Sequence, residues 1–142
     1  MSSLVHIRED TKYFPATQDG IPALALQVTY LVDLYMFWVG VTEESAENVT
    51  KAISEGNLTK DWACAMPPNS ASSSVPASAT SLFRSSGSDI ALSMAQRLAR
   101  RFGKQIFLCV DLPPSYATMG QSGMIVMELE KRVVEVLKLD CS

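Results

Sequence analysis

The stretch Met94–Asp111, read as MAQRLARRFGKQIFLCVD, has the clearest pattern in the chain. Apolar residues recur at every fourth position from Ile90 to Phe102, which is the spacing of one face of a helix. Gly103 stands where a helix commonly ends in the left-handed conformation. Lys104–Asp111 then alternates like a strand and is apolar on both faces, which is typical of a central strand. The stretch therefore predicts a helix followed at once by a strand inside a sheet.

A hairpin is expected upstream of this stretch. Leu24–Tyr30 alternates apolar and polar residues, and Leu34–Val39 is apolar on both faces. With a turn near Leu31–Asp33, the two runs predict paired strands, the second of them central and ending at Gly40. The whole hairpin is also long enough to span a bilayer as one helix. A central aspartate would then cost about 2.5–3.5 kcal/mol, so strands are favoured.

Shorter patterns predict the remaining elements. The expected segments are an edge strand at Leu4–Ile7, a short helix from Thr42 to about Ser54, paired strands at Trp62–Met66 and Val75–Phe83, and a last helix at Met124–Leu139. A buried strand at Ile125–Met127 is the alternative within the last segment. Ser86 or Ser88 is expected to cap the helix that starts near Ile90.

The segments together predict one domain, residues 1–142. Runs rich in proline, serine and glycine predict mobile loops at 67–74 and 113–123. The order of strands, then helix, strand and helix predicts an α+β class: a mainly antiparallel sheet or small β-sandwich with two main helices packed on it.

Composition limits the classes of function. The chain has 142 residues and a net charge of −3, which argues against a general binder of nucleic acid or of anionic membranes. Cys64, Cys109 and Cys141 are odd in number and far apart, so they indicate thiols in a reducing compartment. Charged residues precede any apolar core of signal length, so no secretory signal is expected. We expect the protein in the cytoplasm, with the nucleus as a second compartment.

The residue types that catalytic and metal sites require are scarce. His6 is the only histidine, which leaves no simple way to build a histidine metal cage or a serine–histidine pair. The sequence has no phosphate-binding loop, and its carboxylates are not matched to a base or nucleophile. We therefore expect no catalytic, metal-binding or cofactor-binding residues, and no enzyme. The remaining enzymatic hypothesis is a thiolate at Cys64.

One cluster of charge stands out. Arg97, Arg100, Arg101 and Lys104 lie off the apolar stripe of the predicted helix. They are the candidate residues for binding a partner with an acidic surface. The alternative, to which the sequence gives equal weight, is a solvated helix face whose last cations stabilise the helix C-terminus. No aromatic residue lies between the arginines, so stacking of nucleic-acid bases has no support.

Three blocks of the sequence resemble the proteasome assembly chaperone 4 family. AQRLARRFGKQIFLCVDL resembles that family's A-Q-R-L-A-R helix and K-Q-[IV]-F strand, and DLYMFWVGVTEE resembles its D-x-L-F-L-W-V-G strand and turn. Between them, SSVPASATSLF resembles the I-P-V-S-T-S-L-L strand. The blocks come in family order and cover about Asp33–Leu112. Glu43–Lys60 is longer than expected, and the loop PPSYATMGQSG departs from the pattern.

The resemblance implies a non-catalytic chaperone without cofactors. Such a chaperone pairs with proteasome assembly chaperone 3 as a heterodimer, and the pair binds alpha-type subunits and assists assembly of the alpha ring of the core proteasome. No nucleic acid and no membrane is expected as a partner. The alternative is a stand-alone adaptor that binds an acidic protein or peptide through Arg97, Arg100, Arg101 and Lys104.

Overall fold

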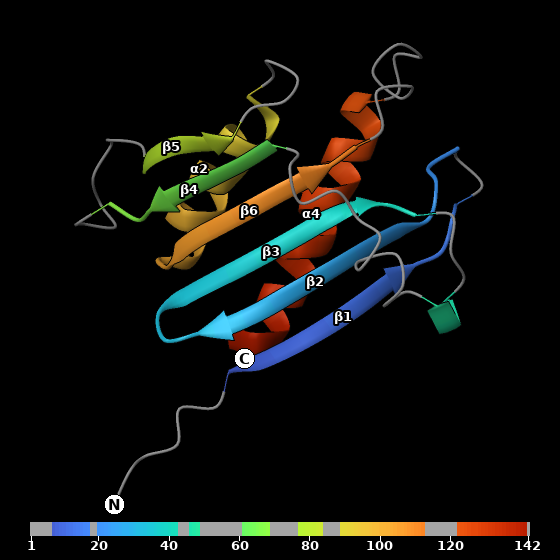
Figure 1. Ribbon diagram of the computed structural model, residues 1–142, viewed down its shortest axis with the longest axis horizontal. Coiled ribbons are helices and arrows are strands. Elements are labelled where there is room, and N and C mark those ends of the chain that lie inside the picture. The colour runs from blue at the N-terminus through green and yellow to red at the C-terminus, as the bar shows by residue number, and fades with distance from the viewer. Residues whose placement is uncertain are drawn as a thin grey trace, which may run out of the picture.

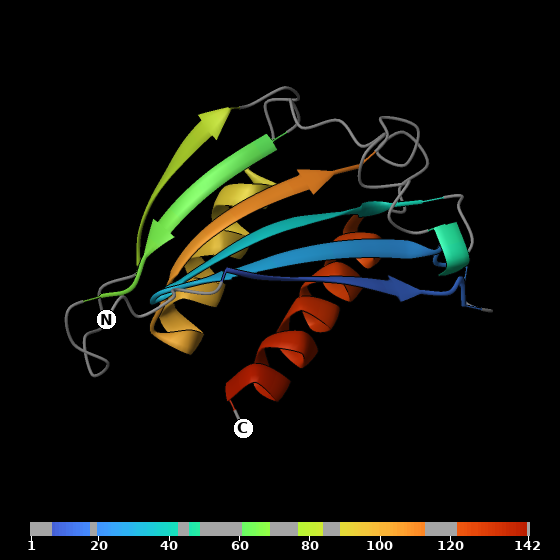
Figure 2. The same ribbon diagram turned by 60° about the horizontal axis from the view of Figure 1, so that its bottom comes forward.

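The computed structural model describes residues 7–17, 20–42, 46–48, 61–68, 77–83, 89–112 and 122–141. In chain order these residues form β1 (Arg8–Phe14), β2 (Leu24–Leu31), β3 (Leu34–Val41), the short 3-10 helix η1 (Ala46–Asn48), β4 (Asp61–Met66), β5 (Ser78–Phe83), α2 (Ile90–Phe102), β6 (Gln105–Asp111) and α4 (Ser122–Cys141). The described strands make one six-stranded sheet in the order β1-β2-β3-β6-β4-β5 (Figure 1). Both α-helices lie on the same face of the sheet (Figure 2). The predicted α+β class is confirmed, in the form of a single sheet.

The chain returns to the middle of the sheet through a crossover. β3 and β6 pair in parallel, whereas the other neighbouring strands pair antiparallel. Two parallel strands cannot be joined by a tight turn, and here the connection contains β4, β5 and α2. β6 therefore lies between β3 and β4, and the prediction that β3 and β6 are central strands is confirmed.

The core lies between the sheet and the helices. Every second residue of the central strands points toward the helices, among them Phe37 and Leu108, which are fully buried. On α2 the predicted apolar stripe packs against them, with Met94 and Leu98 buried. The apolar face of α4 consists of the buried residues Ile125, Leu129, Val133, Val136 and Leu137. Periods of two along a strand and 3.6 along a helix explain this burial.

The predicted hairpin and helix end are confirmed in detail. β2 and β3 are joined by a turn at Val32 and Asp33, and Asp33 has a φ of 54°. A left-handed backbone is tolerated by aspartate better than by most residues. α2 ends at Gly103, whose φ is 64° and whose N–H donates to the carbonyl of Ala99 at 2.9 Å.

Several predicted boundaries were wrong. The edge strand β1 covers Arg8–Phe14: of the predicted Leu4–Ile7 only Ile7 is described, and it lies outside the strand. An edge strand commonly carries polar residues, so the apolar run Leu4–Ile7 did not indicate where this strand lies. Gly40 lies inside β3 and does not end it. The alternative strand at Ile125–Met127 is wrong, because these residues belong to α4.

Other predictions are tested only in part. Of the helix expected after Thr42, the structure describes only the 3-10 helix Ala46–Asn48, and Ser86 and Ser88 lie outside the described residues. The residue before α2 is Asp89, whose side chain makes no capping hydrogen bond. Pro67 and Pro68 have no regular structure, and residues 69–74 and 113–121 are outside the description. No helix among the described residues is long and apolar enough to cross a membrane.

The C-terminal end of α4 is held against the sheet by polar contacts. The Asp140 carboxylate accepts from Arg8 of β1 at 2.6 Å and from the Tyr35 hydroxyl of β3 at 3.0 Å. The Arg8 guanidinium also lies 4.0 Å from the centre of the Tyr30 ring. Asp140 thus joins the helix to two strands of the sheet.

Gly40 allows a close approach between β3 and its neighbours. A Cβ atom at this position would lie 2.8 Å from the Asp111 carbonyl oxygen and 3.1 Å from Cζ2 of Trp38. The carbonyl belongs to the parallel partner strand β6, so it cannot move without disturbing the pairing. Glycine is therefore required where the Trp38 ring packs over the backbone.

We predict that Gly40→Ala lowers the free energy of unfolding by about 1–3 kcal/mol, because the added methyl overpacks the strand pair. Urea denaturation followed by circular dichroism measures this change. Gly123→Ala is the matched control: a Cβ there meets no atom within 4 Å. In the helix α4 this control should leave stability unchanged or raise it by up to about 1 kcal/mol. Equal midpoints for Gly40→Ala and the parent chain would contradict the packing argument.

Candidate functional site

Two of the basic residues predicted to bind a partner are paired within the chain. Arg97 lies on α2, and its Nε is 2.9 Å from Oε1 of Glu130 on α4. Lys104 lies between α2 and β6, and its Nζ is 2.8 Å from Oδ1 of Asp33 in the β2–β3 turn. Each pair joins segments that are far apart in the sequence, so both cations contribute to internal contacts.

The other two basic residues, Arg100 and Arg101, are exposed in the last turn of α2. Arg101 borders the groove between α2 and α4, whereas Arg100 borders a separate hollow on the other side of α2. Arg97 borders both hollows, so the three arginines are neighbours on α2, whereas Lys104 lies beyond the helix end beside Asp33. Their role in binding a partner stays a prediction.

The contact between Lys104 and Asp33 has an electrostatic consequence. The hydrogen bond from Lys104, reinforced by its positive charge, holds the pKa of the Asp33 carboxyl below its ordinary value. The N–H of Gln105 donates to the Asp33 carbonyl at 3.3 Å in the same place. The β2–β3 turn is thus joined to the beginning of β6 by side-chain and backbone contacts.

The face of the sheet opposite the helices carries large apolar side chains in its centre. No described helix or strand packs on this face, as Figure 2 shows. The strand register aligns its residues in rows that cross β3, β6 and β4. One row contains Met36, Phe107 and Cys64, and the next contains Trp38, Cys109 and Trp62. We call these six residues the open sheet face.

The open sheet face is only partly shielded by its own side chains. Trp38 is 5% exposed and packs with Ala25, Cys109 and Trp62. Met36 is 36% exposed, which is high for a large apolar residue in the middle of a sheet. Among the described residues no group accepts a hydrogen bond from the buried indole N–H of Trp38. The face therefore has the composition of a protein interior, although no element in the described part of the chain packs on it.

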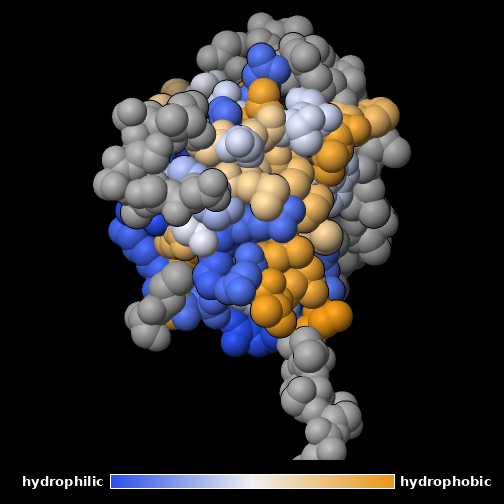
Figure 3. All heavy atoms as spheres, turned by 90° about the vertical axis from the view of Figure 1, so that its left-hand side faces the viewer, coloured by the Kyte–Doolittle hydropathy of each residue, from blue (hydrophilic) through white to orange (hydrophobic). Residues whose placement is uncertain are grey.

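Apolar surface also occurs at one end of the sheet. Figure 3 looks at the end where the β2–β3 turn lies and shows hydrophobic residues gathered beside hydrophilic ones. Val32 in this turn and Ile7 just before β1 are both exposed. Contiguous apolar surface of this kind commonly marks a site of protein–protein contact.

The two cysteines on the open sheet face have different environments. Burial, with smaller effects of Asp111 and Asp61, raises the pKa of the Cys109 thiol to about 12. Cys109 is fully buried, so its thiol belongs to the interior of the fold. Cys64 is half-buried, and its Sγ accepts a hydrogen bond from Nε2 of Gln105 at 3.4 Å. The described residues contain no group of three histidine, cysteine or acidic side chains that could hold a metal ion.

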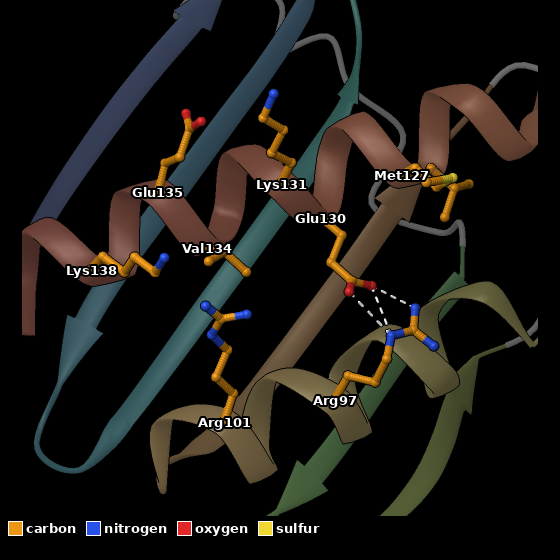
Figure 4. Close-up of a pocket in the computed structure, with 9 residues that line it drawn as sticks. Arg97, Arg101, Met127, Glu130, Lys131, Val134, Glu135 and Lys138 are labelled. Atoms are coloured by element: carbon orange, nitrogen blue, oxygen red, sulfur yellow. Dashed lines mark hydrogen bonds and ion pairs between the residues drawn. The ribbon is translucent and has the colours of Figure 1, made fainter.

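A groove of about 580 Å³ runs between α2 and α4 on the opposite side of the molecule. Figure 4 shows Arg97 and Glu130 meeting across it, and Arg101 reaching from α2 toward Val134 of α4. The groove is lined by Arg97, Arg101, Val126, Met127, Glu130, Lys131, Val134, Glu135 and Lys138. It combines an apolar floor with a charged rim.

Sequence reasoning missed both surfaces for one reason. The sequence favours core positions for Met36, Trp62 and Phe107, because a strand that is apolar on both faces usually has cover on both. A face left open for a partner is the alternative for Met36. The signal was present, since the two long helices expected from the sequence suffice to cover only one face of a sheet. Lys131 and Lys138 on α4 were not considered, because the sequence does not reveal that α4 lies beside α2.

We predict that Lys104→Met raises the pKa of Asp33 toward its ordinary value, measured by NMR titration of the carboxyl carbon. Because the folded-state pKa is lowered, the pair stabilises the fold above the unfolded pKa and loses this effect as the pH falls through the folded pKa. The parent chain and the variant should therefore differ in stability at neutral pH and converge in acid. An unchanged titration of Asp33 would contradict this account of the contact.

Comparison with known proteins identifies the family. A family model described as Proteasome assembly chaperone 4 matches residues 23–112, which is more than half of the 142-residue chain. A solved chain from the crystal structure of a chaperone complex for yeast 20S proteasome assembly has the same fold: the TM-score is 0.63, the sequence identity is 15%, and the match covers 96% of this chain and 98% of that one. A search of curated protein sequences gives no match.

The matched residues include β2, β3, β4, β5, α2 and β6, so they contain most of the sheet and the whole crossover. The resemblance noted in the sequence is thereby confirmed over the three blocks that carry it. The chain belongs to the proteasome assembly chaperone 4 family, a family of non-catalytic chaperones of proteasome assembly.

Proposed function

We propose that the chain acts without catalysis as half of a heterodimer with proteasome assembly chaperone 3, which it binds through the open sheet face. The pair binds alpha-type subunits and assists assembly of the alpha ring of the core proteasome. The observation that carries the heterodimer is the apolar face of β3, β6 and β4, on which none of the described helices or strands packs. Membership of the family and the likeness to a chain from a chaperone complex support the assembly role.

The open sheet face has the composition of an interface centre. Interface centres are enriched in aromatic residues and methionine and depleted in charge, and here two tryptophans, a phenylalanine and a methionine lie together. A polar rim follows on β1 and β2, where the amide of Gln27 donates to the Glu9 carboxylate. Two sheets that pack face to face stand about 10 Å apart and bury such side chains between them. The partner is therefore expected to present an apolar sheet face of its own.

We propose that the pair acts in the cytoplasm, with the nucleus as a second compartment. Cys64 and Cys109 are free thiols in the structure, in keeping with a reducing environment. Imaging of a tagged full-length chain tests this, and a signal confined to the secretory pathway would contradict it.

We predict that Met36→Asp weakens the heterodimer by more than about tenfold, equivalent to ~1.4 kcal/mol, because it places a charge in the apolar centre. Co-expression with proteasome assembly chaperone 3 and size-exclusion chromatography measure the loss. Met124→Asp is the control: Met124 is also exposed, but lies on α4, on the helix side of the sheet. A Met36→Asp chain that pairs as well as the Met124→Asp chain would refute the open sheet face as the interface.

We also predict that the partner protects Cys64 from alkylation. In a Cys141→Ser background, iodoacetamide should modify Cys64 slowly in the chain alone and far more slowly in the heterodimer, as measured by mass spectrometry. Cys109 is the internal reference, since its buried thiol, with a pKa of about 12, should stay unmodified in both states. Equal modification of Cys64 in both states would exclude this face from the contact. In that case the stand-alone adaptor becomes the better hypothesis.

A further inference from the structure

The groove between α2 and α4 has an excess of unpaired positive charge. Of the two acidic residues on its rim, Glu130 is paired with Arg97 at 2.9 Å, and Glu135 lies 3.2 Å from Nη1 of Arg132, an arginine that also pairs with Glu128. The basic residues left over are Arg101, Lys131 and Lys138. In the described part of the chain none of these three forms an ion pair. The groove is thus locally basic in a chain whose net charge is −3.

The floor of the same groove is apolar and accessible. Val126 and Val134 lie half-buried against the core, and Met127 beside them is 75% exposed. Methionine adapts its shape to different apolar partners and is common at binding surfaces. The groove therefore offers a place for an apolar side chain between groups that attract carboxylates.

The groove and the open sheet face lie on opposite sides of the molecule, because both helices cover one face of the sheet (Figure 2). A partner that covers the sheet leaves the helices exposed. The heterodimer would then still present the groove to a second protein. The two surfaces can be occupied at the same time.

We infer that this groove docks an acidic segment of the alpha-type subunit, with one apolar side chain seated on Met127 and Val134 and carboxylates facing Arg101, Lys131 and Lys138. The inference rests on the proposed function, and it names the surface through which the pair holds its client. Charge complementarity selects an acidic occupant, and the rim contains no aromatic residue on which a nucleic-acid base could stack. This surface is shared by α2 and α4 and includes Arg97 and Arg101 of the predicted cluster.

Binding of the purified heterodimer to immobilised alpha-type subunits, followed by surface plasmon resonance, tests the inference. Lys131→Glu should weaken binding about tenfold through charge reversal, and the loss should shrink at high salt. Lys12→Glu changes charge equally at an exposed site on β1 outside the groove and should leave binding unchanged. Met127→Asp should weaken binding in the same way, whereas Met124→Asp, on the same helix but outside the groove, should not.

Each outcome is decisive. Loss with Lys131→Glu and Met127→Asp alone, with heterodimer formation intact on size-exclusion chromatography, supports the groove. Equal binding by all variants overturns the groove while the proposed function stands. Failure of the parent heterodimer to bind any alpha-type subunit overturns the proposed function, and the client named here with it. Loss of the heterodimer itself in Lys131→Glu also overturns the inference, because it would show that the two surfaces are not separate.

Discussion

The parallel pairing of β3 with β6 is the contact on which the rest of the structure depends. These two strands are apolar on both faces, and every other strand is added to one side or the other of them. One face of the pair supports α2 and α4 and forms the core. The other face has Met36, Trp38, Phe107 and Cys109 in its centre, and none of the described helices or strands packs on it. A strand pair that is apolar on both sides needs cover on both, and the described residues supply it on one.

This imbalance connects folding to function. A chain that completes its core with its own helices can fold, yet it retains an apolar surface that favours association. Polar contacts at the edges hold the chain's own elements together. Arg8 and Tyr35 hold the end of α4 through Asp140, and Lys104 joins the β2–β3 turn to β6 through Asp33. The helix side of the molecule is therefore charged and held by ion pairs, whereas the opposite face of the sheet is apolar. Two chemically different faces are consistent with the two contacts proposed above.

Local patterns predicted most of the fold, whereas the arrangement of elements in space limited the prediction of the site. The helix Ile90–Phe102, its glycine end and the strands around it followed from periodicity, because each depends on residues close in sequence. The edge strand was misplaced, since β1 is fixed by pairing with β2 and not by its own apolar content. The sequence identified Arg97 and Lys104 as members of a basic cluster. It did not show their carboxylate partners, because these lie 33 and 71 residues away in the chain. The residues of the open sheet face were interpreted as core for the same reason, because a sequence alone does not show which apolar surfaces pack against each other.

The central claim is that a partner chain covers the open sheet face, and the two tryptophans of the protein report on it directly. Trp38 and Trp62 both lie on this face, the first buried and the second half-buried. The chain can be labelled with 5-fluorotryptophan and its fluorine NMR spectrum recorded alone and with unlabelled proteasome assembly chaperone 3. The account predicts that the Trp62 resonance shifts on pairing and loses its solvent isotope effect between H₂O and D₂O. A heterodimer that forms while the Trp62 resonance keeps its position and its solvent isotope effect would contradict it.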